Sequence, residues 1–566
     1  MVDFENKNIF WHTSAHVLAY AVKNLFPDVK FGIGPAIENG FYYDFDNIQI
    51  QESDIERIEK EAKRIIKMKL IPEKYVISRE SALNMFSGQP FKNELIKDLN
   101  GEISYYKIGD FCDLCRGPHL ENISEIKSIK ILSIAGAYWK GNSNNKMMTR
   151  IYAVSFPEEN MMKDYLDFLE EAKKRDHRLI GKQLDLFSFH PEAPGAVFWH
   201  ENGWILRNEI INKWRKFHYE NDYKEINTPI LLDSELWKTS GHWDLYRENM
   251  YITSVENKEF AVKPMNCPGS ILYYKEKARS YRDFPLKFAE LGLVHRFELS
   301  GTLHGLMRVR QFTQDDAHIF IKEEMLLSEI KKIIIMSVDL LKQFGFKDFI
   351  FTVSVRNEEK KEKYLGSEEI WSKATSTLEK ALGELSYDYR VSPGDAKFYG
   401  PSVDIIIKDN LGREWQCSTL QLDFNLPERF SLEYTDSDGT KKVPIMLHRT
   451  LLGSLERFIG IFIENCNGVF PFDLSPVQVV ILPISEKQKD FSEKINSILR
   501  NKNIRSEISK SEETFSKRLR NTIIRKIPYI VIIGDKEVAE NKISVRKYGE
   551  NESKSYETED FIKIIL

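Results

Sequence analysis

Apolar and polar residues repeat with different periods along the chain, and the changes of period divide it into four segments. Residues 1–155 combine a helical start with short alternating strands such as SYYKIGDFC. Residues 156–182 include the run PEENMMKDYLDFLEEAKKRD, keep apolar residues at helical spacing up to Gly181, and are predicted to form a connecting helix. Residues 183–474 contain a long series of strands and helices, and residues 475–566 alternate strand and helix like a small α/β domain.

One predicted strand is unusual because neither of its faces is apolar. The stretch HGLMRVRQFTQDDAHIF, residues 304–320, alternates like a β-strand. Burying charged side chains costs several kcal/mol unless partners are supplied, so an edge strand with both faces in water is the simpler interpretation. The face with more charged and polar side chains carries Arg308, Arg310, Phe312, Gln314, Asp316 and His318.

Arginines on neighbouring segments favour another interpretation, a site for a polyanion. Upstream, HRFE places Arg296 and Glu298 on one side of a strand, and a downstream helix carries Arg457 behind Gly453 and Ser454. The guanidinium fork matches phosphate oxygens in a bidentate manner. The sequence has neither G-x-x-x-x-G-K nor G-x-G-x-x-G, so phosphate would be bound by arginines on a sheet.

Composition limits the classes of protein to which the chain can belong. Its 566 residues have a net charge of −4, so overall basicity gives no indication of nucleic acid binding, and any such surface must be local. No apolar run reaches the ~18 residues of a membrane span, and the start of the chain lacks the pattern of a signal peptide. The five cysteines are few and odd in number, which favours a cytoplasmic location.

Two sets of cysteines and histidines are candidate metal ligands. Near the amino terminus, His12 and His16 share a helical face, and DLCRGPH supplies Asp113, Cys115 and His119. From spacing alone, H-x3-H with C-x3-H predicts a tetrahedral zinc site, with solvent-facing histidines and a structural cysteine as the alternative. Cys112 and Cys115 could also form a redox pair, but no thioredoxin-like sequence context follows them. The second set, Cys267, His318 and His448, is dispersed in the sequence.

Several motifs together resemble one family. HRFELSGTLHGLMRVRQFTQDDAHIF resembles the second signature motif of class II aminoacyl-tRNA synthetases in its threonyl-specific form. GSLERFIGIFIE resembles their third motif, and Pro229 in EINTPIL resembles the proline of the first, which lies at a dimer interface. The resemblance implies an α+β multidomain fold: an antiparallel catalytic sheet flanked by helices, an amino-terminal α+β editing domain and a carboxyl-terminal α/β anticodon-binding domain. It also implies a homodimer.

The resemblance assigns the ATP site residue by residue. Arg296 would contact the α-phosphate and the forming carbonyl, and Glu298 would contact the adenine amino group. Phe312 would stack on adenine, and Mg²⁺ would accompany ATP. The remaining assignments are Arg308 and Arg457 to the phosphate tail, Gln416 to the nucleotide site, and His242 in SGHWDLY to the terminal ribose of the tRNA, where we expect it to assist proton removal.

The resemblance also joins Cys267, His318 and His448 as ligands of one zinc ion. Three protein ligands leave an open position, which can take the amino and hydroxyl groups of threonine and thereby reject valine. Asp316 is placed to accept the hydroxyl proton, and Gln314, Tyr399 and Gln421 match other pocket positions. Serine lacks only one methyl group, worth roughly 1 kcal/mol, so a second, proofreading site is expected.

Residues 1–155 resemble the editing domain of bacterial-type threonyl-tRNA synthetases. This implies hydrolysis of seryl-tRNA by an activated water without an obligatory metal, whereas the spacing of His12, His16, Cys115 and His119 predicts zinc; we adopt the metal-free interpretation. Lys92 in PFKNEL matches an editing lysine, and Asp113 belongs to the same site. The sequence starts almost directly at this domain, so the ubiquitin-like domain of many relatives is expected to be absent.

The last segment resembles an anticodon-binding domain. Residues 477–566 contain 18 Lys and Arg and 14 Asp and Glu, a net of +4, and the run KRLRNTIIRK has five basic residues and no acidic one. Such a run suits phosphate contacts, although a solvated helix face is the more usual meaning. Glu537 in GDKE and Arg546 in SVRK are candidate anticodon contacts.

The resemblance therefore implies ATP-dependent ligation of L-threonine to tRNA(Thr) through threonyl-adenylate, with editing of seryl-tRNA(Thr). Two alternatives stay open at this point. A class II ligase for serine or proline would share the arginines but does not need the three metal ligands. A non-catalytic relative that regulates by binding RNA typically loses motif arginines or zinc ligands, and here both sets are present.

Overall fold

The computed structural model describes residues 4–142, 144–510 and 512–566. By its internal contacts the chain separates into two units, Met1–Glu171 and Ala172–Leu566. In the part of the chain that the model describes, no helix is both long enough and apolar enough to cross a membrane.

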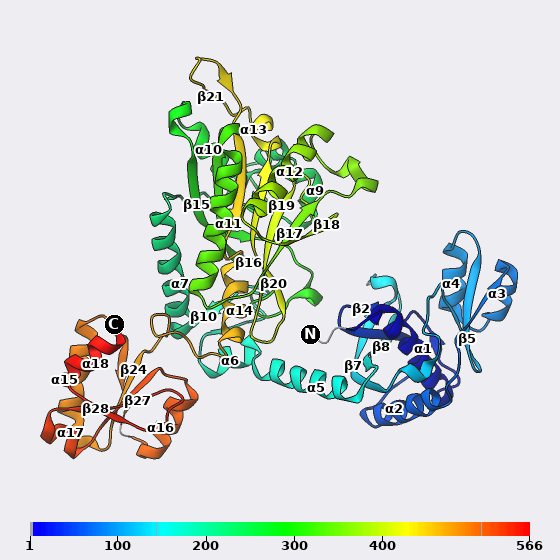
Figure 1. Cartoon of the computed structure of the whole chain (residues 1–566), viewed down its shortest axis with the longest axis horizontal. Helices are drawn as coiled ribbons and strands as arrows, with labels where there is room; N and C mark the ends of the chain where they lie inside the picture. The colour runs from blue at the N-terminus through cyan, green and yellow to red at the C-terminus, as the bar shows by residue number, and fades with distance from the viewer. Residues whose placement is uncertain (1–3, 143, 511) are drawn as a thin grey trace. The chain divides into compact units, whose positions relative to one another are not determined.

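The first unit contains two antiparallel sheets (Figure 1). The larger has the order β1-β3-β8-β7, with β2 paired to β3, and packs against α1, whose residues Phe10–Val22 are almost all buried. The smaller has the order β4-β5-β6. The bounds are α1 Lys7–Leu25, β1 Lys30–Phe31, β2 Ala36–Ile37, β3 Gly40–Asp46, α2 Glu52–Lys67, β4 Glu73–Ile77, α3 Arg79–Met85, α4 Pro90–Asp98, β5 Ile103–Ile108, β6 Phe111–Leu114, β7 Ser128–Tyr138 and β8 Met147–Phe156.

The second unit contains an eight-stranded sheet of order β11-β15-β16-β23-β20-β19-β17-β18. Its central pairs are antiparallel and its two edge pairs are parallel, so the predicted antiparallel catalytic sheet is confirmed. The strand bounds are β11 Lys224–Glu225, β15 Leu286–His295, β16 Gln311–Ile321, β17 Phe349–Val355, β18 Tyr389–Pro393, β19 Ser402–Lys408, β20 Glu414–Asp423 and β23 Ile445–Thr450.

Apolar residues of four long helices and of shorter segments join those of the sheet in one core cluster. These helices are α7 (Glu201–Glu220), α11 (Leu326–Gln343), α12 (Glu368–Glu384) and α14 (Leu455–Asn465). Shorter elements complete this part: β9 Phe187–Ser188, β10 Phe198–Trp199, β12 Leu231–Asp233, α8 Ser234–Ser240, α9 His242–Tyr246, β13 Tyr251–Val255, β14 Lys258–Val262, α10 Cys267–Lys275, α13 Asn425–Arg429, β21 Tyr434–Thr435 and β22 Lys441–Lys442.

The carboxyl-terminal part forms a mixed sheet of order β25-β24-β26-β27-β28. β24 is parallel to β25 and β26, and the remaining pairs are antiparallel, which agrees with the predicted α/β domain. The bounds are β24 Val479–Pro483, α15 Lys489–Asn501, β25 Ser506–Ile508, α16 Phe515–Ile524, β26 Tyr529–Ile533, α17 Asp535–Glu540, β27 Ile543–Lys547, β28 Lys554–Tyr556 and α18 Thr558–Ile565.

The connecting segment differs from the single helix expected over residues 156–182. It forms α5 (Glu159–Lys174) and α6 (His177–Gln183), with a break at Arg175 and Asp176. The carboxylate of Asp176 accepts a hydrogen bond from the backbone N–H of Arg178 and so caps a new helix. Asp is a favourable N-cap residue, and this local interaction competes with continuation of α5.

The polar strand is also shorter and more central than expected. β16 begins at Gln311, because residues 304–308 form a turn in which the His304 N–H donates to the Arg308 carbonyl and Gly305 has a φ of +48°. β16 pairs with β15 on one side and β23 on the other, and both of its faces are largely buried. The edge-strand interpretation is therefore wrong, and the polar face must have partners inside the protein.

Candidate active site

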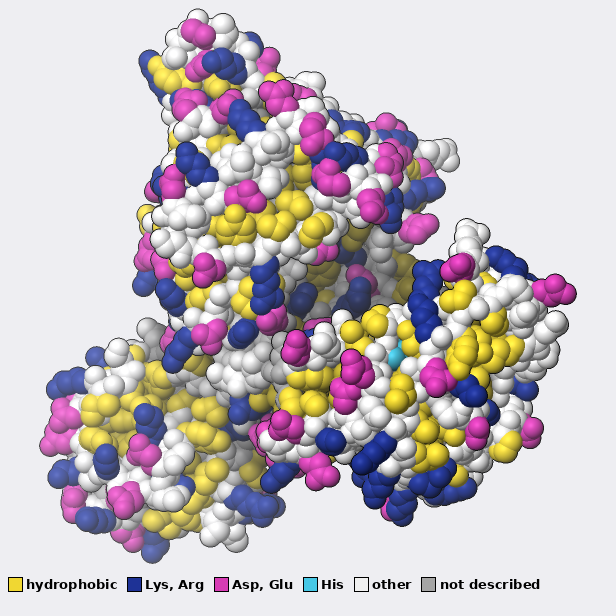
Figure 2. Space-filling view, turned by 45° about the vertical axis from the view of Figure 1, so that its right-hand side comes forward, with side chains coloured by type: hydrophobic (Ala, Val, Ile, Leu, Met, Phe, Trp, Pro, Cys, Tyr) yellow, Lys and Arg dark blue, Asp and Glu magenta, His cyan; other side chains and the backbone are white. Residues whose placement is uncertain are grey.

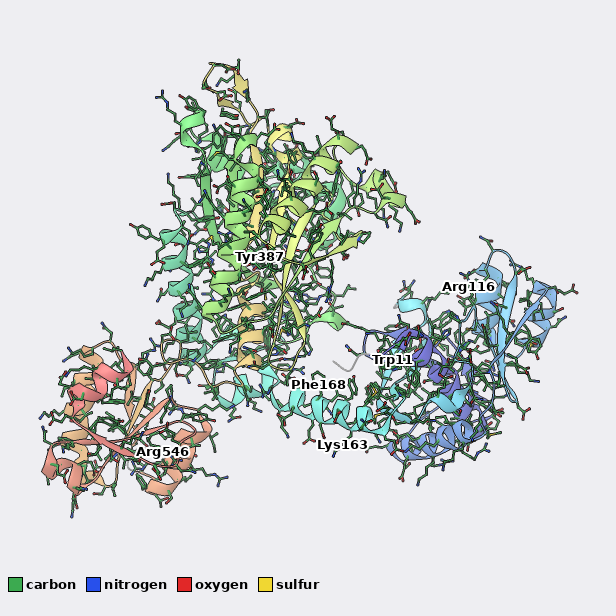
Figure 3. All side chains as sticks on the ribbon, viewed as in Figure 1. Trp11, Arg116, Lys163, Phe168, Tyr387 and Arg546 are labelled. Carbon is green, nitrogen blue, oxygen red and sulfur yellow. The ribbon has the colours of Figure 1, made fainter. Side chains whose placement is uncertain are left out.

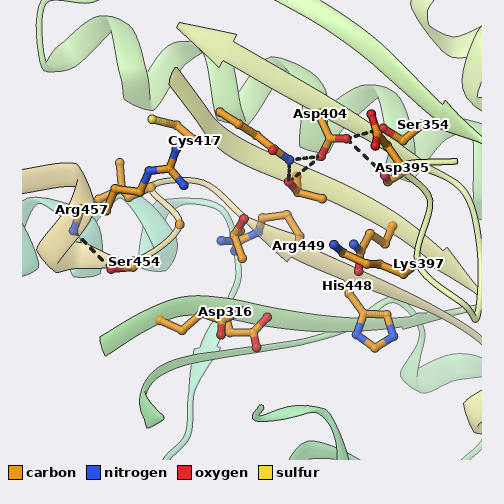
Figure 4. Close-up of a pocket in the computed structure, with 18 of the residues that line it drawn as sticks. Asp316, Ser354, Asp395, Lys397, Asp404, Cys417, His448, Arg449, Ser454 and Arg457 are labelled. Carbon is orange, nitrogen blue, oxygen red and sulfur yellow. Dashed lines mark hydrogen bonds between the residues drawn. The ribbon is translucent and has the colours of Figure 1, made fainter. Parts of the chain in front are cut away.

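A cavity of about 1170 Å³ in the second unit collects the residues expected to bind ATP and the amino acid. They come from β16, β20, β23, α10, the start of α14, and the loops before β16 and β19. Figure 4 shows Arg457 and Ser454 toward one end of this cavity and His448 toward the other. The expected residues that line it are Arg296, Glu298, Arg308, Phe312, Gln314, Asp316, Tyr399, Gln416, Gln421, Arg457, Cys267 and His448.

The three candidate metal ligands converge because of strand register. His318 of β16 and His448 of β23 are direct cross-strand partners, and their ring centroids lie 5.0 Å apart. Cys267 is the first residue of α10, and its sulfur completes a group whose ligand atoms all lie within 4.8 Å of one another. The sheet and α10 thus bring together three residues that are separated by 51 and 130 positions in sequence.

The chemistry of this group fits a metal cation. Nε2 of His318 is buried and has no hydrogen-bond partner among the described residues, an arrangement that costs free energy unless a ligand is bound there. Nε2 of His448 lies 2.8 Å from a carboxylate oxygen of Asp423, which leaves Nδ1 for coordination. Burial raises the pKa of the Cys267 thiol, so a thiolate at this position requires a compensating positive charge.

The wall beside these ligands is polar and internally bonded. The Tyr399 hydroxyl donates to Gln421 Oε1 at 2.6 Å, and its ring lies 5.1 Å from that of His448. Asp316 accepts a hydrogen bond from Asn266 Nδ2 at 3.2 Å, and burial raises the pKa of Asp316 to about 7. These groups offer several donors and acceptors next to the metal ligands, as a small polar substrate requires.

Arginines line the rest of the cavity. The Arg296 guanidinium lies 5.1 Å from the Phe312 ring centroid and donates to the Pro264 carbonyl. Arg308 is paired with Glu298 at 3.0 Å. Nε of Arg457 is buried and has no hydrogen-bond partner in the described part of the chain. Arginines with unused donors beside an aromatic ring suit a nucleotide with a phosphate tail.

His242 does not reach the cavity. Its side chain is fully buried, with Nδ1 bonded to Ser240 Oγ at 2.7 Å, and its ring lies 5.6 Å from that of Phe398, which lines the cavity. Burial, followed by the charges of neighbouring cations, lowers the pKa of His242 to about 3. His242, the expected proton acceptor, is therefore separated from the cavity by the ring of Phe398.

Sequence patterns did not reveal several residues that orient the site. Asp423 holds His448, Asn266 holds Asp316, and Asp404 accepts from Gln416 Nε2 at 2.6 Å. Lys397 lines the cavity and has no ion-pair partner among the described residues. Only Asp423 had a sequence signal, because it follows Gln421 at the two-residue spacing of one strand face.

The amino-terminal histidines and cysteine form a second group, which lies in the first unit. His12 and His16 lie on α1 one turn apart, and the ligand atoms of His12, His16, Cys115 and His119 lie within 4.8 Å of one another. Cys115 Sγ lies 3.3 Å from His12 Nε2 and 3.2 Å from His119 Nε2, and it accepts from the Gly117 N–H. Burial raises the pKa of Cys115 to about 11 and lowers that of His119 to about 2, so the group is neutral.

A buried ion pair adjoins this group. Lys92 of α4 pairs with Asp113, which also accepts a hydrogen bond from the Tyr43 hydroxyl at 2.5 Å. His16 Nε2 lies 3.8 Å from the same carboxylate. The structure thus brings Lys92 and Asp113 to the histidines with which the sequence analysis grouped them, and it adds Tyr43.

The candidate anticodon residues have internal partners. Glu537 Oε2 accepts from the Gly534 N–H at the start of α17, and Arg546 of β27, labelled in Figure 3, donates to the Glu550 carbonyl. The run KRLRNTIIRK is not one open basic patch: Arg518 is buried and donates to the Pro483 carbonyl, and Arg525 pairs with Glu507. On the face seen in Figure 2, basic and acidic side chains are interspersed over this region.

Family models match most of the chain. Residues 251–466 match the tRNA synthetase class II core domain (G, H, P, S and T), residues 478–566 match the anticodon binding domain, and residues 103–152 match the threonyl and alanyl tRNA synthetase second additional domain. The three matches fall on the cavity, the mixed carboxyl-terminal sheet and the group around Cys115.

Individual relatives match the chain over its whole length. The threonine–tRNA ligase of Caldanaerobacter subterraneus is 50% identical over 100% of this chain and 88% of its own length, and that of Carboxydothermus hydrogenoformans is 50% identical over 100% and 89%. A crystal structure titled as the RNA binding domain of threonyl-tRNA synthetase from Cryptosporidium parvum is 37% identical, with a TM-score of 0.66 over 69% of this chain and 97% of that one. A putative threonyl-tRNA synthetase from Aeropyrum pernix is 32% identical, with a TM-score of 0.60 over 68% and 90%.

These similarities favour the threonyl branch over the ligases for serine and proline that the arginine-rich sheet alone would have allowed. With half of its residues identical over its whole length to named relatives, the chain belongs to the threonine–tRNA ligase family of class II aminoacyl-tRNA synthetases.

Proposed function

We propose that the chain ligates L-threonine to tRNA(Thr) through threonyl-adenylate, with release of pyrophosphate, and that it hydrolyses mischarged seryl-tRNA(Thr). One observation carries the choice of amino acid: Cys267, His318 and His448 meet beside a cavity whose lining includes several arginines. A three-ligand metal centre beside a polyanion site suits an amino acid that must be recognised by its hydroxyl group and activated by ATP.

Zinc is the proposed ion, since a thiolate and two imidazoles form a borderline-soft ligand set. When bound, the ion supplies a Lewis acid for the amino and hydroxyl groups of threonine. Asp316, buried beside the metal ligands and lining the cavity, takes up the hydroxyl proton. Tyr399, Gln421 and Gln314 orient the amino acid from the adjoining wall.

In the nucleotide half of the cavity, catalysis rests on positioning and charge. The adenine ring stacks on Phe312, its amino group donates to Glu298, and Gln416 closes the nucleotide site. Arg296 contacts the α-phosphate and the carboxylate that attacks it, and Arg308 and Arg457 hold the phosphate tail that accompanies Mg²⁺. In-line attack is then favoured by orientation and by fixed positive charge.

The acyl group passes from the adenylate to the terminal ribose of the tRNA. We assign proton removal from that ribose to His242; burial lowers its pKa to about 3, too low for an effective base, so the ring must leave this buried environment to act. Phe398 separates the ring from the cavity, so this role requires Phe398 to move when tRNA binds. Unchanged single-turnover transfer in His242→Ala would assign the step to another group.

Editing is assigned to the first unit without a metal ion. A water is activated by the neutral imidazoles of His12, His16 and His119, which lie beside Cys115. The pair of Lys92 and Asp113 orients the ester bond of seryl-tRNA. The metal-free assignment follows the family resemblance, and the hydrogen bonds of Cys115 Sγ with the Gly117 N–H and of His119 Nδ1 with Thr13 Oγ1 at 3.1 Å fix the orientation of both side chains.

The remaining assignments follow the family. Residues 1–155 would edit, 156–182 connect, 183–474 synthesise and 475–566 bind the anticodon through Glu537 and Arg546. The chain would work as a homodimer, with Pro229 at the interface, in the cytoplasm.

The deciding assay is ATP–pyrophosphate exchange with threonine, serine, valine and proline, with and without a zinc chelator. We expect strong exchange with threonine, weaker exchange with serine, negligible exchange with valine and loss on chelation. Exchange specific for proline, or indifferent to the chelator, would contradict the proposal.

A further inference from the structure

A buried histidine outside the cavity links two of the elements that bind ATP. His177, the first residue of α6, is completely buried. Its Nδ1 lies 2.6 Å from Glu464 Oε1, which also accepts from the His177 backbone N–H at 3.0 Å. On the other side of the ring, the Leu306 N–H donates to His177 Nε2 at 3.0 Å.

These contacts fix the tautomer of the ring and leave no room for a metal. Asp176, His177 and Glu464 are close enough to share an ion, but both imidazole nitrogens are already used. A backbone N–H can donate only to an unprotonated nitrogen, so the proton of the ring is on Nδ1 and points at Glu464. The guanidinium of Arg413, 2.7 Å from the other oxygen of Glu464, keeps this carboxylate charged.

The hydrogen bonds from Leu306 through the His177 ring to Glu464 form a bridge between two elements. The Leu306 end of this bridge belongs to the turn that precedes β16. Leu306 is itself fully buried, and the next two residues, Met307 and Arg308, line the cavity. Gly305 has a φ of +48°, and a Cβ at this position would lie 2.2 Å from His177 Nε2. The chain therefore has glycine where the ring makes its closest approach, and the contact between ring and turn is tight.

The Glu464 end of the bridge belongs to α14. Glu464 lies in the last turn of this helix, and Arg457 lies in its first. Because a helix is stiff over this length, the position of Glu464 determines that of Arg457 to a large extent. One imidazole thus connects the turn that presents Arg308 with the helix that presents Arg457.

We propose that His177 is a positioning residue for adenylate formation: its Nδ1–H tautomer holds the turn 304–308 against α14, so that Arg308 and Arg457 face the triphosphate together. The inference rests on the proposed ATP-dependent activation, and His177 itself does not line the cavity. Among the described residues, none of Cys267, His318 and His448 in the amino acid half hydrogen-bonds to His177, Leu306 or Glu464.

Two replacements separate the two hydrogen bonds of the ring. In His177→Asn the side-chain amide can still donate to Glu464 but cannot reach the Leu306 N–H, whereas in His177→Gln an oxygen can accept from Leu306. We expect His177→Asn to raise the KM for ATP in pyrophosphate exchange about tenfold, since a buried N–H loses its acceptor. The KM for threonine should change less than about twofold, and His177→Gln should restore most of the ATP affinity.

The matched control is His200→Asn. His200 also bonds a carboxylate, Asp185, and a further partner, Ser188, but it is at the surface and does not line the cavity. Its replacement should leave both KM values unchanged. If His177→Asn does not fold, Glu464→Met, which removes the acceptor for the ring while Arg413 keeps its pair with Asp409, should give the same selective rise in the KM for ATP.

The outcomes distinguish this inference from the proposed function. Wild-type protein without threonine-dependent exchange would refute the function. Active wild type together with an unchanged KM for ATP in His177→Asn would refute the positioning role alone. Equal increases in the KM values for ATP and threonine, without rescue by His177→Gln, would show a general structural role and also overturn the inference.

Discussion

The carboxylate behind His448 gives a sharp test of the proposed metal centre. Asp423 is fully buried, and its Oδ2 lies 2.8 Å from His448 Nε2, while Oδ1 accepts from the backbone N–H groups of Asn425 and Leu426 at the start of α13. In Asp423→Asn the amide oxygen can keep both backbone hydrogen bonds. The amide nitrogen then faces His448 and cannot accept from its N–H.

The expected loss of zinc affinity in Asp423→Asn follows from the contact of Asp423 with His448. Removing a carboxylate that orients a ligating histidine typically costs about 10–100-fold in metal affinity, or roughly 1.4–2.8 kcal/mol. Asp423 does not line the cavity, so the KM for ATP at saturating zinc should not change. The defect should therefore disappear when enough zinc is added.

The assay is titration of dialysed protein with zinc against a chromogenic competing chelator, with threonine-dependent pyrophosphate exchange measured at each free zinc concentration. The control is Asp44→Asn, another buried carboxylate, which pairs with Arg150 at 2.7 Å and belongs to the other unit. Unchanged zinc affinity in Asp423→Asn, or a loss of exchange that zinc does not restore, would refute the reasoning.

Three further predictions concern other parts of the chain. Burial, followed by the charge of Arg449, lowers the pKa of His218 to about 2, so the neutral ring is required in the folded state and stability falls as pH drops below the unfolded value near 6.5. The loss should reach about 2 kcal/mol at pH 5, and thermal unfolding of His218→Gln should depend less on pH between 5 and 7. Lys92→Met leaves Asp113 buried without its cation, so hydrolysis of seryl-tRNA should fall by about 100-fold or more while threonylation persists; equal hydrolysis would remove Lys92 from the editing site. Chelation of zinc should abolish threonylation but not hydrolysis of pre-formed seryl-tRNA, and loss of both in parallel would contradict the metal-free editing site.

Local patterns in the sequence predicted much of the chemistry. The spacing of His12 and His16 places both on one face of α1, and alternation in β16 places Gln314, Asp316 and His318 on one face. Both inferences need only the period of one element. The antiparallel sheet, in contrast, was predicted from family motifs.

Other features depend on tertiary contacts that no local pattern contains. The alternation over residues 304–310 predicted a strand, but Gly305 and the contact with His177 favour a turn. The basic run of α16 suggested an open patch, although Arg518 is needed inside to satisfy the Pro483 carbonyl. Asp423 acquires its role only when β20 pairs with β23.

The direct pairing of His318 with His448 has a consequence for how such chains can diverge. Insertion of one residue within β16 or β23 would shift one imidazole to the opposite side of the sheet, so selection should forbid length changes inside these strands. The loops within residues 322–444, in contrast, can gain or lose residues without altering the geometry of the ligands. Homologous chains should therefore differ freely in the spacing between these two histidines and very little in the residues that flank each of them.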